Sequence, residues 1–404
     1  MTQAMDQFTT QPVERVTRVP SRADVRLPGI DRLRGLVILL MALDHVRDFF
    51  NADALYFAPT DLARTHPALF LTRFVTHYCA PTFVFLAGAS AFLHGTKLDD
   101  RRALARFLIT RGAWLILLDI VVVSPVWGLE LGLIYLATLW AIGFSMIVLA
   151  GLVFVPPRAV LLTGVLILLG HNLLDPAHAS AFENLAPLWT MLHEPGALPF
   201  GLHGWVSYPV LPWIGIMAVG YGLGHVFLEP ATKRERQLTV LGLAAIALFL
   251  LLRGTNLYGD PHPWSVQAND IMTALSMLNV TKYPPSLLYA LVTLGPIFLL
   301  LPAMERLGGF VGEVLATYGR VPLFIYLLHL YVARAAAIVL WLVEGFDFHQ
   351  LRGFGIQVAP PEGLGLSLAG TYAAWILIMA ALYPACRWYA GVKQRRRDWW
   401  LSYL

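Results

Sequence analysis

Four ionisable side chains follow one another closely at the end of an apolar segment near the start of the chain. After the uncharged stretch Gly35–Leu43, five positions hold Asp44, His45, Arg47 and Asp48. On a helix, His45 and Asp48 are three positions apart and share a face. A histidine beside a carboxylate suits general-base catalysis, because the carboxylate fixes the tautomer and stabilises the imidazolium. We therefore take His45 as a candidate base with Asp44 or Asp48 orienting its ring; a charge-paired helix end is the alternative.

A second histidine lies where the next apolar segment begins. His77 follows Arg73 by four positions and precedes Pro81, which should kink the helix. We expect His77 to be an auxiliary catalytic residue, and an interfacial histidine is the alternative. Arg73 is expected to pair with a carboxylate of the first segment or to bind an anionic group of the substrate.

A third histidine lies deep in a later apolar segment. His329 shares a helix face with Tyr326 at a spacing of three residues. We take His329 as a candidate for cofactor binding, and a hydrogen bond between helices is the alternative. The chain has no GxxxxGK[ST], HExxH or GxSxG motif, and its two cysteines, Cys79 and Cys386, form no CxxC pair. Because the histidines are scattered, no metal site is expected.

The composition determines which elements must position these groups. Of 404 residues, 57% are hydrophobic and 13% are charged, against about 25% charged in a soluble domain. The mean hydropathy is +0.64. These values exclude a soluble enzyme, a nucleic-acid binder and a disordered chain. They predict an all-α polytopic integral membrane protein, since a bilayer core takes roughly 20 apolar residues per helix.

About ten transmembrane helices are expected from the apolar runs. The runs lie near 34–50, 76–94, 107–127, 133–153, 159–175, 207–227, 238–253, 285–303, 321–343 and 366–386. The remaining parts are a polar N-terminal tail, 1–29, and a basic C-terminal tail, 391–404, on either side of one transmembrane domain, 30–390. The tail 1–29 has no apolar core of a signal peptide, so no cleavable signal is expected.

The basic residues predict the orientation. With the N-terminus inside, 22 of the 29 Lys and Arg residues fall on inner segments. This asymmetry obeys the positive-inside rule and predicts that both termini are cytoplasmic, in a bacterial-type inner membrane. The net charge of +4 then reflects topology and contact with anionic lipid, and no nucleic-acid partner is expected.

The expected outer segments are long and the inner ones are short. The outer segments near 51–75, 176–206, 254–284 and 344–365 are rich in His, Pro, Trp and Tyr. Loops of this length usually have a function. They are consistent with an extracytoplasmic site that holds a sugar-like acceptor on aromatic faces, and amphipathic cover at the membrane interface is the alternative.

Several segments together resemble a known family. They are Gly29–Gly35 running into Met41, Asp44–Phe50, Cys79–Gly88, Leu211–Ile216, Lys282–Leu287 and Gly319–Phe324. Over most of residues 27–390 the chain resembles a bacterial membrane-protein family. That family is grouped with the catalytic domain of heparan-alpha-glucosaminide N-acetyltransferase in the transmembrane acyltransferase superfamily.

The resemblance implies an acyl-CoA donor, typically acetyl-CoA, that binds from the cytoplasm and an acceptor on the outer side. In the lysosomal enzyme the acceptor is a glucosamine amine, and a histidine in the loop after the first span is thought to act. The corresponding loop here holds His66, and spacing does not choose between His66 and His77. An asparagine near the end of that enzyme's first span falls at His45.

The sequence therefore predicts a membrane acyltransferase that moves an acetyl group from acetyl-CoA to an amine or hydroxyl of an extracytoplasmic sugar or glycan. The candidate cofactor-binding residues are Arg34, Arg101, Arg102, Arg320 and His329. The candidate substrate-binding residues are Arg73, Trp213 and Lys282. The lipid bilayer is the expected environment, and the sequence leaves a homo-oligomer open.

Two other functions stay open at this point. A proton-coupled secondary transporter or flippase also uses ionisable groups inside the membrane as relays. Transporters usually show internal repeats, and the two halves of this chain show no clear match. A non-catalytic membrane scaffold is the third possibility.

Overall fold

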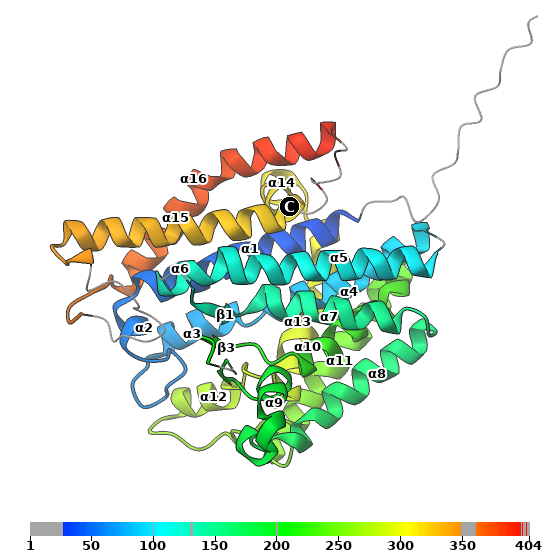
Figure 1. Ribbon diagram of the computed structural model, residues 1–404, viewed down its shortest axis with the longest axis horizontal. Coiled ribbons are helices and arrows are strands. Elements are labelled where there is room, and N and C mark those ends of the chain that lie inside the picture. Colours follow the sequence, from blue (N-terminus) through cyan, green and yellow to red (C-terminus); the bar gives the residue numbers. More distant parts are fainter. Residues whose placement is uncertain are drawn as a thin grey trace, which may run out of the picture.

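The computed structural model describes residues 27–98, 100–129, 132–198, 201–348, 361–396, 398 and 401. The structure is mostly helical, at 75%, and its long helices form one bundle (Figure 1). Nearly all of the expected tail 1–29 and part of the expected tail 391–404 lie outside the described residues.

Eight helical stretches within the described residues are long and apolar enough to cross a membrane. Four are made of consecutive elements: α3 (Pro67–Thr76) with α4 (Cys79–Leu98); α5 (Arg101–Leu118), η2 (Asp119–Val123) and α6 (Ser124–Gly128); α8 (Pro157–Gly170) with η3 (His171–Leu174); and α10 (Leu211–Gly222) with η5 (Gly224–Leu228). Four are single helices: α11 (Ala231–Thr255), α13 (Leu287–Arg306), α15 (Pro322–Val343) and α16 (Leu368–Arg395).

Helices also form at the other two expected spans. These are α1 (Pro28–Phe50) and α7 (Thr138–Leu152). The first carries the ionisable cluster, and the second has only 15 residues. The all-α membrane class is thus confirmed, whereas the count of ten spans and the cytoplasmic position of both termini remain predictions.

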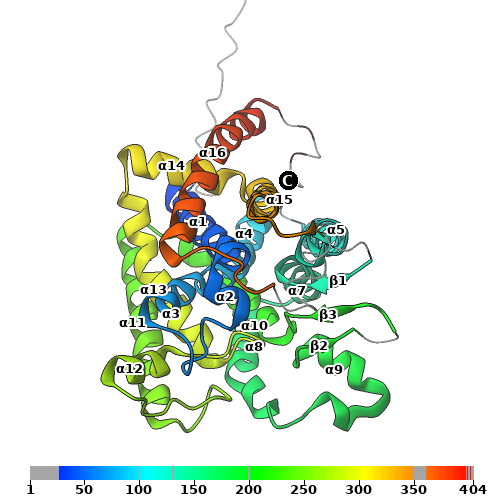
Figure 2. The same ribbon diagram turned by 90° about the vertical axis from the view of Figure 1, so that its left-hand side faces the viewer.

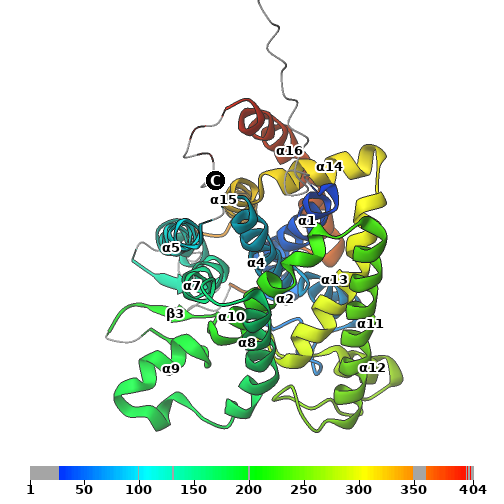
Figure 3. The ribbon, with the colours of Figure 1, turned by 90° about the vertical axis from the view of Figure 1, so that its right-hand side faces the viewer.

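Helix α1 lies in the middle of the bundle. It contacts α13, α15, α16 and α14 (Gly309–Arg320). Viewed along the bundle, α5 and α7 lie on one side of α1 and α4, and α11 and α13 lie on the other (Figures 2 and 3). Residues on several faces of α1 are buried, so side chains near its end can meet residues from distant parts of the chain.

Close helix contact depends on glycine where α1 crosses α14. A Cβ on Gly35 would lie 1.8 Å from the carbonyl oxygen of Leu315, and one on Gly319 would lie 1.8 Å from that of Asp31. No side chain fits at either distance. Small residues let two membrane helices approach to backbone contact, and here they set the position of α1 against the C-terminal part of the bundle.

Several short elements lie between the long helices in the sequence. They are α2 (Ala52–Tyr56), η4 (Ala179–Leu185), α9 (Ala186–Leu192), α12 (Asp270–Leu278) and the strands β1 (Ile134–Leu136), β2 (Gly196–Ala197) and β3 (Gly204–Val206). Strand β3 pairs in parallel with β1 and antiparallel with β2. The all-helical prediction missed this small sheet, because strands of two or three residues leave no readable alternation.

A buried carboxylate holds the start of α7 beside the sheet. Asp119, fully buried in η2, accepts hydrogen bonds from the backbone N–H groups of Ala137 at 2.8 Å and Trp140 at 3.0 Å. A carboxylate is favourable there because the first N–H groups of a helix lack partners and carry partial positive charge. Asp119 thereby positions Thr138, which borders the candidate site.

Candidate functional site

His45 forms a hydrogen bond with His329, a residue 284 positions away in the sequence. His45 Nδ1 lies 2.8 Å from His329 Nε2, and the two rings are nearly parallel, at 7°. His329 is fully buried, whereas His45 is half-buried and borders a cavity. The rings of Trp127 and His45 are nearly perpendicular, at 87°, with centroids 5.4 Å apart.

The hydrogen bonds assign the tautomers of both histidines. His329 Nδ1 lies 2.7 Å from the carbonyl oxygen of Ile325, which can only accept, so this nitrogen must carry the proton. In neutral His329, Nε2 is then an acceptor, and His45 Nδ1 must donate to it. This assignment leaves the lone pair on His45 Nε2 free, as a general base requires.

The carboxylates expected to orient His45 have other partners. Asp44 Oδ1 accepts from Arg73 Nη1 at 2.7 Å and from the Thr76 hydroxyl at 2.5 Å, and lies 2.7 Å from Arg47 Nη2. Asp48 accepts from Arg47 at 2.6 Å. Within the described residues, neither carboxylate bonds to the His45 ring, and the side chain that does bond to it is His329.

Lys282 completes a charged cluster around Asp44. Its ammonium lies 3.8 Å from Asp44 Oδ2 and 5.2 Å from the centre of the Tyr283 ring. Burial raises the pKa of the Tyr283 phenol, but the charges of Lys282 and Arg73 outweigh burial and lower that pKa below its ordinary value. The cluster holds three cations and two carboxylates: Arg47, Arg73, Lys282, Asp44 and Asp48. It therefore carries a formal excess of one positive charge.

The His45 cavity has a volume of about 280 Å³. Its walls include Asp44, Asp48, Phe49, Trp127, Tyr135, Tyr208, Tyr283, Tyr326 and Arg334. Aromatic rings and a few charged groups around a histidine form a surface suited to a small polar molecule with apolar faces.

Two more cavities follow α1 toward its first residues. The Met41 cavity, about 390 Å³, is lined mainly by apolar side chains and shares Thr138 and Tyr326 with the His45 cavity. The Arg34 cavity, about 450 Å³, shares Arg34, Ser90 and His94 with the Met41 cavity. The three cavities thus form a series along α1, from Arg34 to His45.

Only one of the expected basic cofactor-binding residues borders this series. Arg34 donates to the Ser90 hydroxyl at 2.6 Å and lines two cavities. Arg101 bonds to the carbonyl of Phe154, and Arg320 pairs with Glu313. Those two residues and the exposed Arg102 line none of the three cavities. His329, also expected to bind cofactor, is instead the partner of His45.

The other candidate histidines lie away from the His45 cavity. His77 is buried between the rings of Phe74 and Tyr289, at centroid distances of 6.0 and 5.4 Å. His66 caps the start of α3 by accepting from the backbone N–H of Leu69. Neither lines the cavity beside His45.

Of the expected substrate-binding residues, none lines the cavity directly. Trp213 is fully buried and stacks on Tyr208, a wall residue, with centroids 5.3 Å apart. Arg73 and Lys282 hold Asp44, another wall residue. All three therefore support the cavity wall.

Several wall residues had not been identified from the sequence. Trp127, Tyr135, Tyr208 and Tyr283 face the His45 cavity, and Lys97, Arg111 and Arg234 border the other two. The many aromatic residues of the outer segments were a signal for the first group, but they did not indicate which of these residues line the cavity. The position of the second group beside the cavities depends on how the helices pack, and no sequence signal indicated it.

Comparison with known families gives a match. The profile described as "Heparan-alpha-glucosaminide N-acetyltransferase, catalytic" matches residues 26–257, which is more than half of the chain and includes α1 with Arg34 and His45. Comparison with curated proteins gives no match. The chain belongs to the family of the heparan-alpha-glucosaminide N-acetyltransferase catalytic domain.

Proposed function

We propose that this membrane protein transfers an acetyl group from acetyl-CoA to an amine or hydroxyl of a sugar or glycan, with His45 as the base. The family is of the membrane acetyltransferase type. The observation that carries the proposal is the series of cavities along α1, which leads from the basic Arg34 cavity to the free nitrogen of His45.

The Arg34 cavity suits the polar end of the donor. Arg34, Lys97 and Arg234 border it together with Asp31 and Glu229, a formal excess of one positive charge. Guanidinium groups bind phosphate oxygens through charge-assisted hydrogen bonds. The Met41 cavity beyond it is mostly apolar and suits a thin flexible chain such as the pantetheine arm. The thioester would then lie near Tyr326 and Thr138, which border both the Met41 cavity and the His45 cavity.

The transfer step follows from the tautomer of His45. His45 Nε2 takes the proton of the acceptor as its nitrogen or oxygen forms a bond to the acetyl carbonyl carbon. The carbon–sulfur bond breaks, and CoA leaves as the thiol with that proton. His329 accepts the Nδ1–H of His45 throughout, which holds the ring in place while its charge changes.

The acceptor side is supported by the walls of the His45 cavity. The faces of Trp127, Tyr135 and Tyr208 suit a sugar ring, and the excess positive charge of the neighbouring cluster favours an acceptor with an anionic group. The 22 to 7 distribution of basic residues supports a cytoplasmic Arg34 end and an outer His45 end.

Purified protein in proteoliposomes tests this proposal. With labelled acetyl-CoA on the Arg34 side and a mixture of amino sugars and neutral sugars on the other, we expect acceptor-dependent CoA release and a labelled acetylated sugar. Saturable acetyl-CoA binding without any acetylated product would contradict the enzyme. Movement of an unmodified solute without acetyl-CoA binding would favour the transporter, for which a series of cavities is also suitable.

Labelling of introduced cysteines tests the orientation. A cysteine at position 21 should react only from the cytoplasmic side of intact cells. Labelling from outside would show that the N-terminus is extracytoplasmic, and the proposed direction of transfer would then be wrong.

A further inference from the structure

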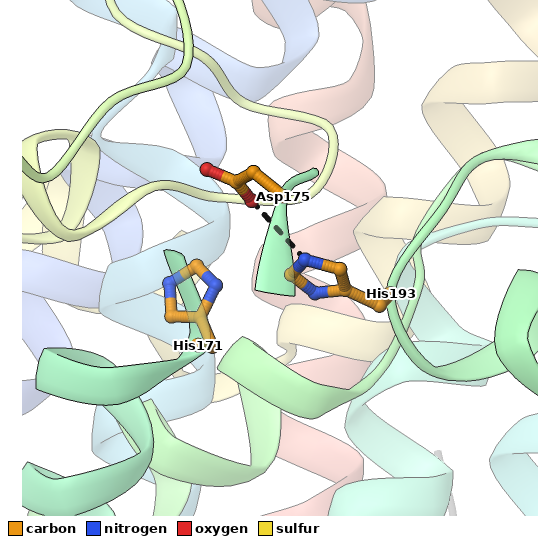
Figure 4. A group of neighbouring side chains, drawn as sticks. All are labelled: His171, Asp175 and His193. Atoms are coloured by element: carbon orange, nitrogen blue, oxygen red, sulfur yellow. Dashed lines mark hydrogen bonds and ion pairs between the residues drawn. The ribbon is translucent and has the colours of Figure 1, made fainter. Parts of the chain in front are cut away.

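Three potential metal ligands lie together outside the cavities along α1. They are His171 in η3, Asp175 at the end of η3 and His193 after α9. One ligand atom from each residue lies within 4.8 Å of those of the other two. Figure 4 shows the carboxylate of Asp175 between the two imidazole rings.

The group contains buried nitrogen atoms that lack hydrogen-bond partners. His171 is only 2% exposed, and neither of its ring nitrogens has a partner within the described residues. His193 is 3% exposed, and its Nδ1 also lacks one. A neutral imidazole carries one N–H and one lone pair, and burying both unpaired is costly. A cation at the centre of the group would take one lone pair of His171 and that of His193 Nε2, so the unpartnered nitrogens of His171 are the ones that point to it.

The spacing of one ligand pair is close to that of a tetrahedral site, and the ligand atom of His171 lies within 4.8 Å of the other two. His193 Nε2 lies 3.1 Å from Asp175 Oδ1. With metal–ligand distances of about 2.0–2.2 Å, two ligands of a tetrahedral Zn²⁺ lie about 3.3–3.6 Å apart. The pair is therefore already near its coordinating separation, and a side-chain rotation of His171 would complete a third ligand.

The surroundings hold the carboxylate in this position. The side-chain amide of Asn172 donates to Asp175 Oδ2 at 2.8 Å, while the Asn172 Oδ1 accepts from the backbone N–H of Leu287 at 2.9 Å. One carboxylate oxygen is thus anchored to the start of α13, and the other points toward His193. Hydrogen bonds of this kind orient the ligands of protein metal sites.

We propose that His171, Asp175 and His193 bind one Zn²⁺ ion, with water as the fourth ligand. Two imidazoles and one carboxylate suit Zn²⁺ and exclude the hard cations Mg²⁺ and Ca²⁺, which take oxygen ligands. The ion joins the end of α8 to the end of α9, 22 positions apart from His171 to His193. Binding stabilises the folded loop between them, because the unfolded chain does not hold the three ligands together. The site does not depend on the proposed acetyl transfer.

Metal content and binding measured on the full chain test the site. After chelation and removal of the chelator, wild-type protein in detergent should take up one equivalent of Zn²⁺ in competition with a chromophoric chelator. The midpoint temperature of its thermal unfolding should rise when Zn²⁺ is added. The variants H171Q and H193Q should each weaken binding about tenfold or more and lose the rise. D175N keeps the size of the side chain and should also weaken Zn²⁺ binding, so it tests the site if a histidine variant fails to fold.

H178Q is the matched control. His178 lies in the same loop, is exposed and contacts Glu194 rather than the group. It should bind Zn²⁺ like the wild type, and transfer activity is not needed as a readout. Wild-type protein that binds no Zn²⁺ would show that the group holds water only. Equal binding by H171Q, H193Q and H178Q would mean adventitious binding, and either result overturns the proposal.

Discussion

The Nδ1 atom of His45 lies 2.8 Å from Nε2 of His329, whose own Nδ1 bonds to a backbone carbonyl. A hydrogen-bonded chain of two imidazoles and a carbonyl therefore fixes the tautomer of His45. The ring that faces the cavity presents an unprotonated nitrogen without needing a carboxylate partner.

The first prediction concerns His45 itself. H45A should lower acetyl transfer by about 10²–10⁴-fold, the usual contribution of a positioned base. Acetyl-CoA binding should stay near the wild-type value, because the basic Arg34 cavity lies about 16 Å away along α1. The measurement is CoA release per folded molecule together with CoA binding.

H66A is the control for this variant, because His66 is partly exposed and lines none of the three cavities. It should transfer acetyl groups at nearly the wild-type rate. If H66A lost activity while H45A kept it, the base would be His66.

The second prediction separates the positioning role of His329 from a structural one. H329A removes the acceptor of the His45 N–H, which costs about 1–3 kcal/mol and lowers kcat by about one to two orders of magnitude. KM for acetyl-CoA should change little. H329N, which can still accept a hydrogen bond, should recover part of kcat. A purely structural His329 would instead lower folded yield and leave kcat per folded molecule unchanged in both variants.

The third prediction concerns donor binding. R34Q removes a guanidinium that borders two cavities, and loss of a charged hydrogen bond of about 1.5–3 kcal/mol should weaken acetyl-CoA binding about tenfold or more. R102Q, on an exposed residue that lines none of the three cavities, should leave binding unchanged. Titration calorimetry at two salt concentrations gives the acetyl-CoA affinity of each variant. Equal affinities for R34Q and R102Q would show that the donor does not bind in the Arg34 cavity.

The fourth prediction concerns the charged cluster. Asp44 is 11% exposed in its side chain and contacts Arg47 and Arg73, both at 2.7 Å. D44N should destabilise the protein by about 3–5 kcal/mol, because it leaves buried cations without their counter-ion. The double variant D44N/R73Q should be more stable than the two single effects added together. Thermal unfolding in detergent measures each term, and strict additivity would show that the two residues are not coupled.

The fifth prediction concerns the contact of α1 with α14. G319A introduces a methyl group 1.8 Å from the Asp31 carbonyl oxygen, so the helices must separate and the folded yield should fall sharply. G308A lies at the start of the same helix and has no atom within 4 Å of its Cβ position. It should fold like the wild type, and size-exclusion chromatography of the two proteins makes the comparison.

The helices and the membrane class could be predicted from the sequence because they depend on local composition. Apolar runs of roughly 20 residues must become helices in a bilayer, since every backbone group needs an internal partner. The rarity of charge inside such runs also singled out His45, Asp44 and Asp48. The small sheet could not be predicted, since its strands have too few residues to show a pattern and β1 pairs with β3 across the separation from Ile134 to Gly204.

The sequence by itself thus determined the helical membrane class, the approximate spans and the unusual first helix with its candidate base. Tertiary structure decided the partners. It placed His329 against His45 across 284 positions and brought His171, Asp175 and His193 together. The sequence had predicted that Arg73 pairs with a carboxylate of the first segment, and the structure selected Asp44. The physical reason is that a hydrogen bond or a shared ion depends on distances of about 3 Å, and those distances arise only when helices far apart in the chain pack against one another.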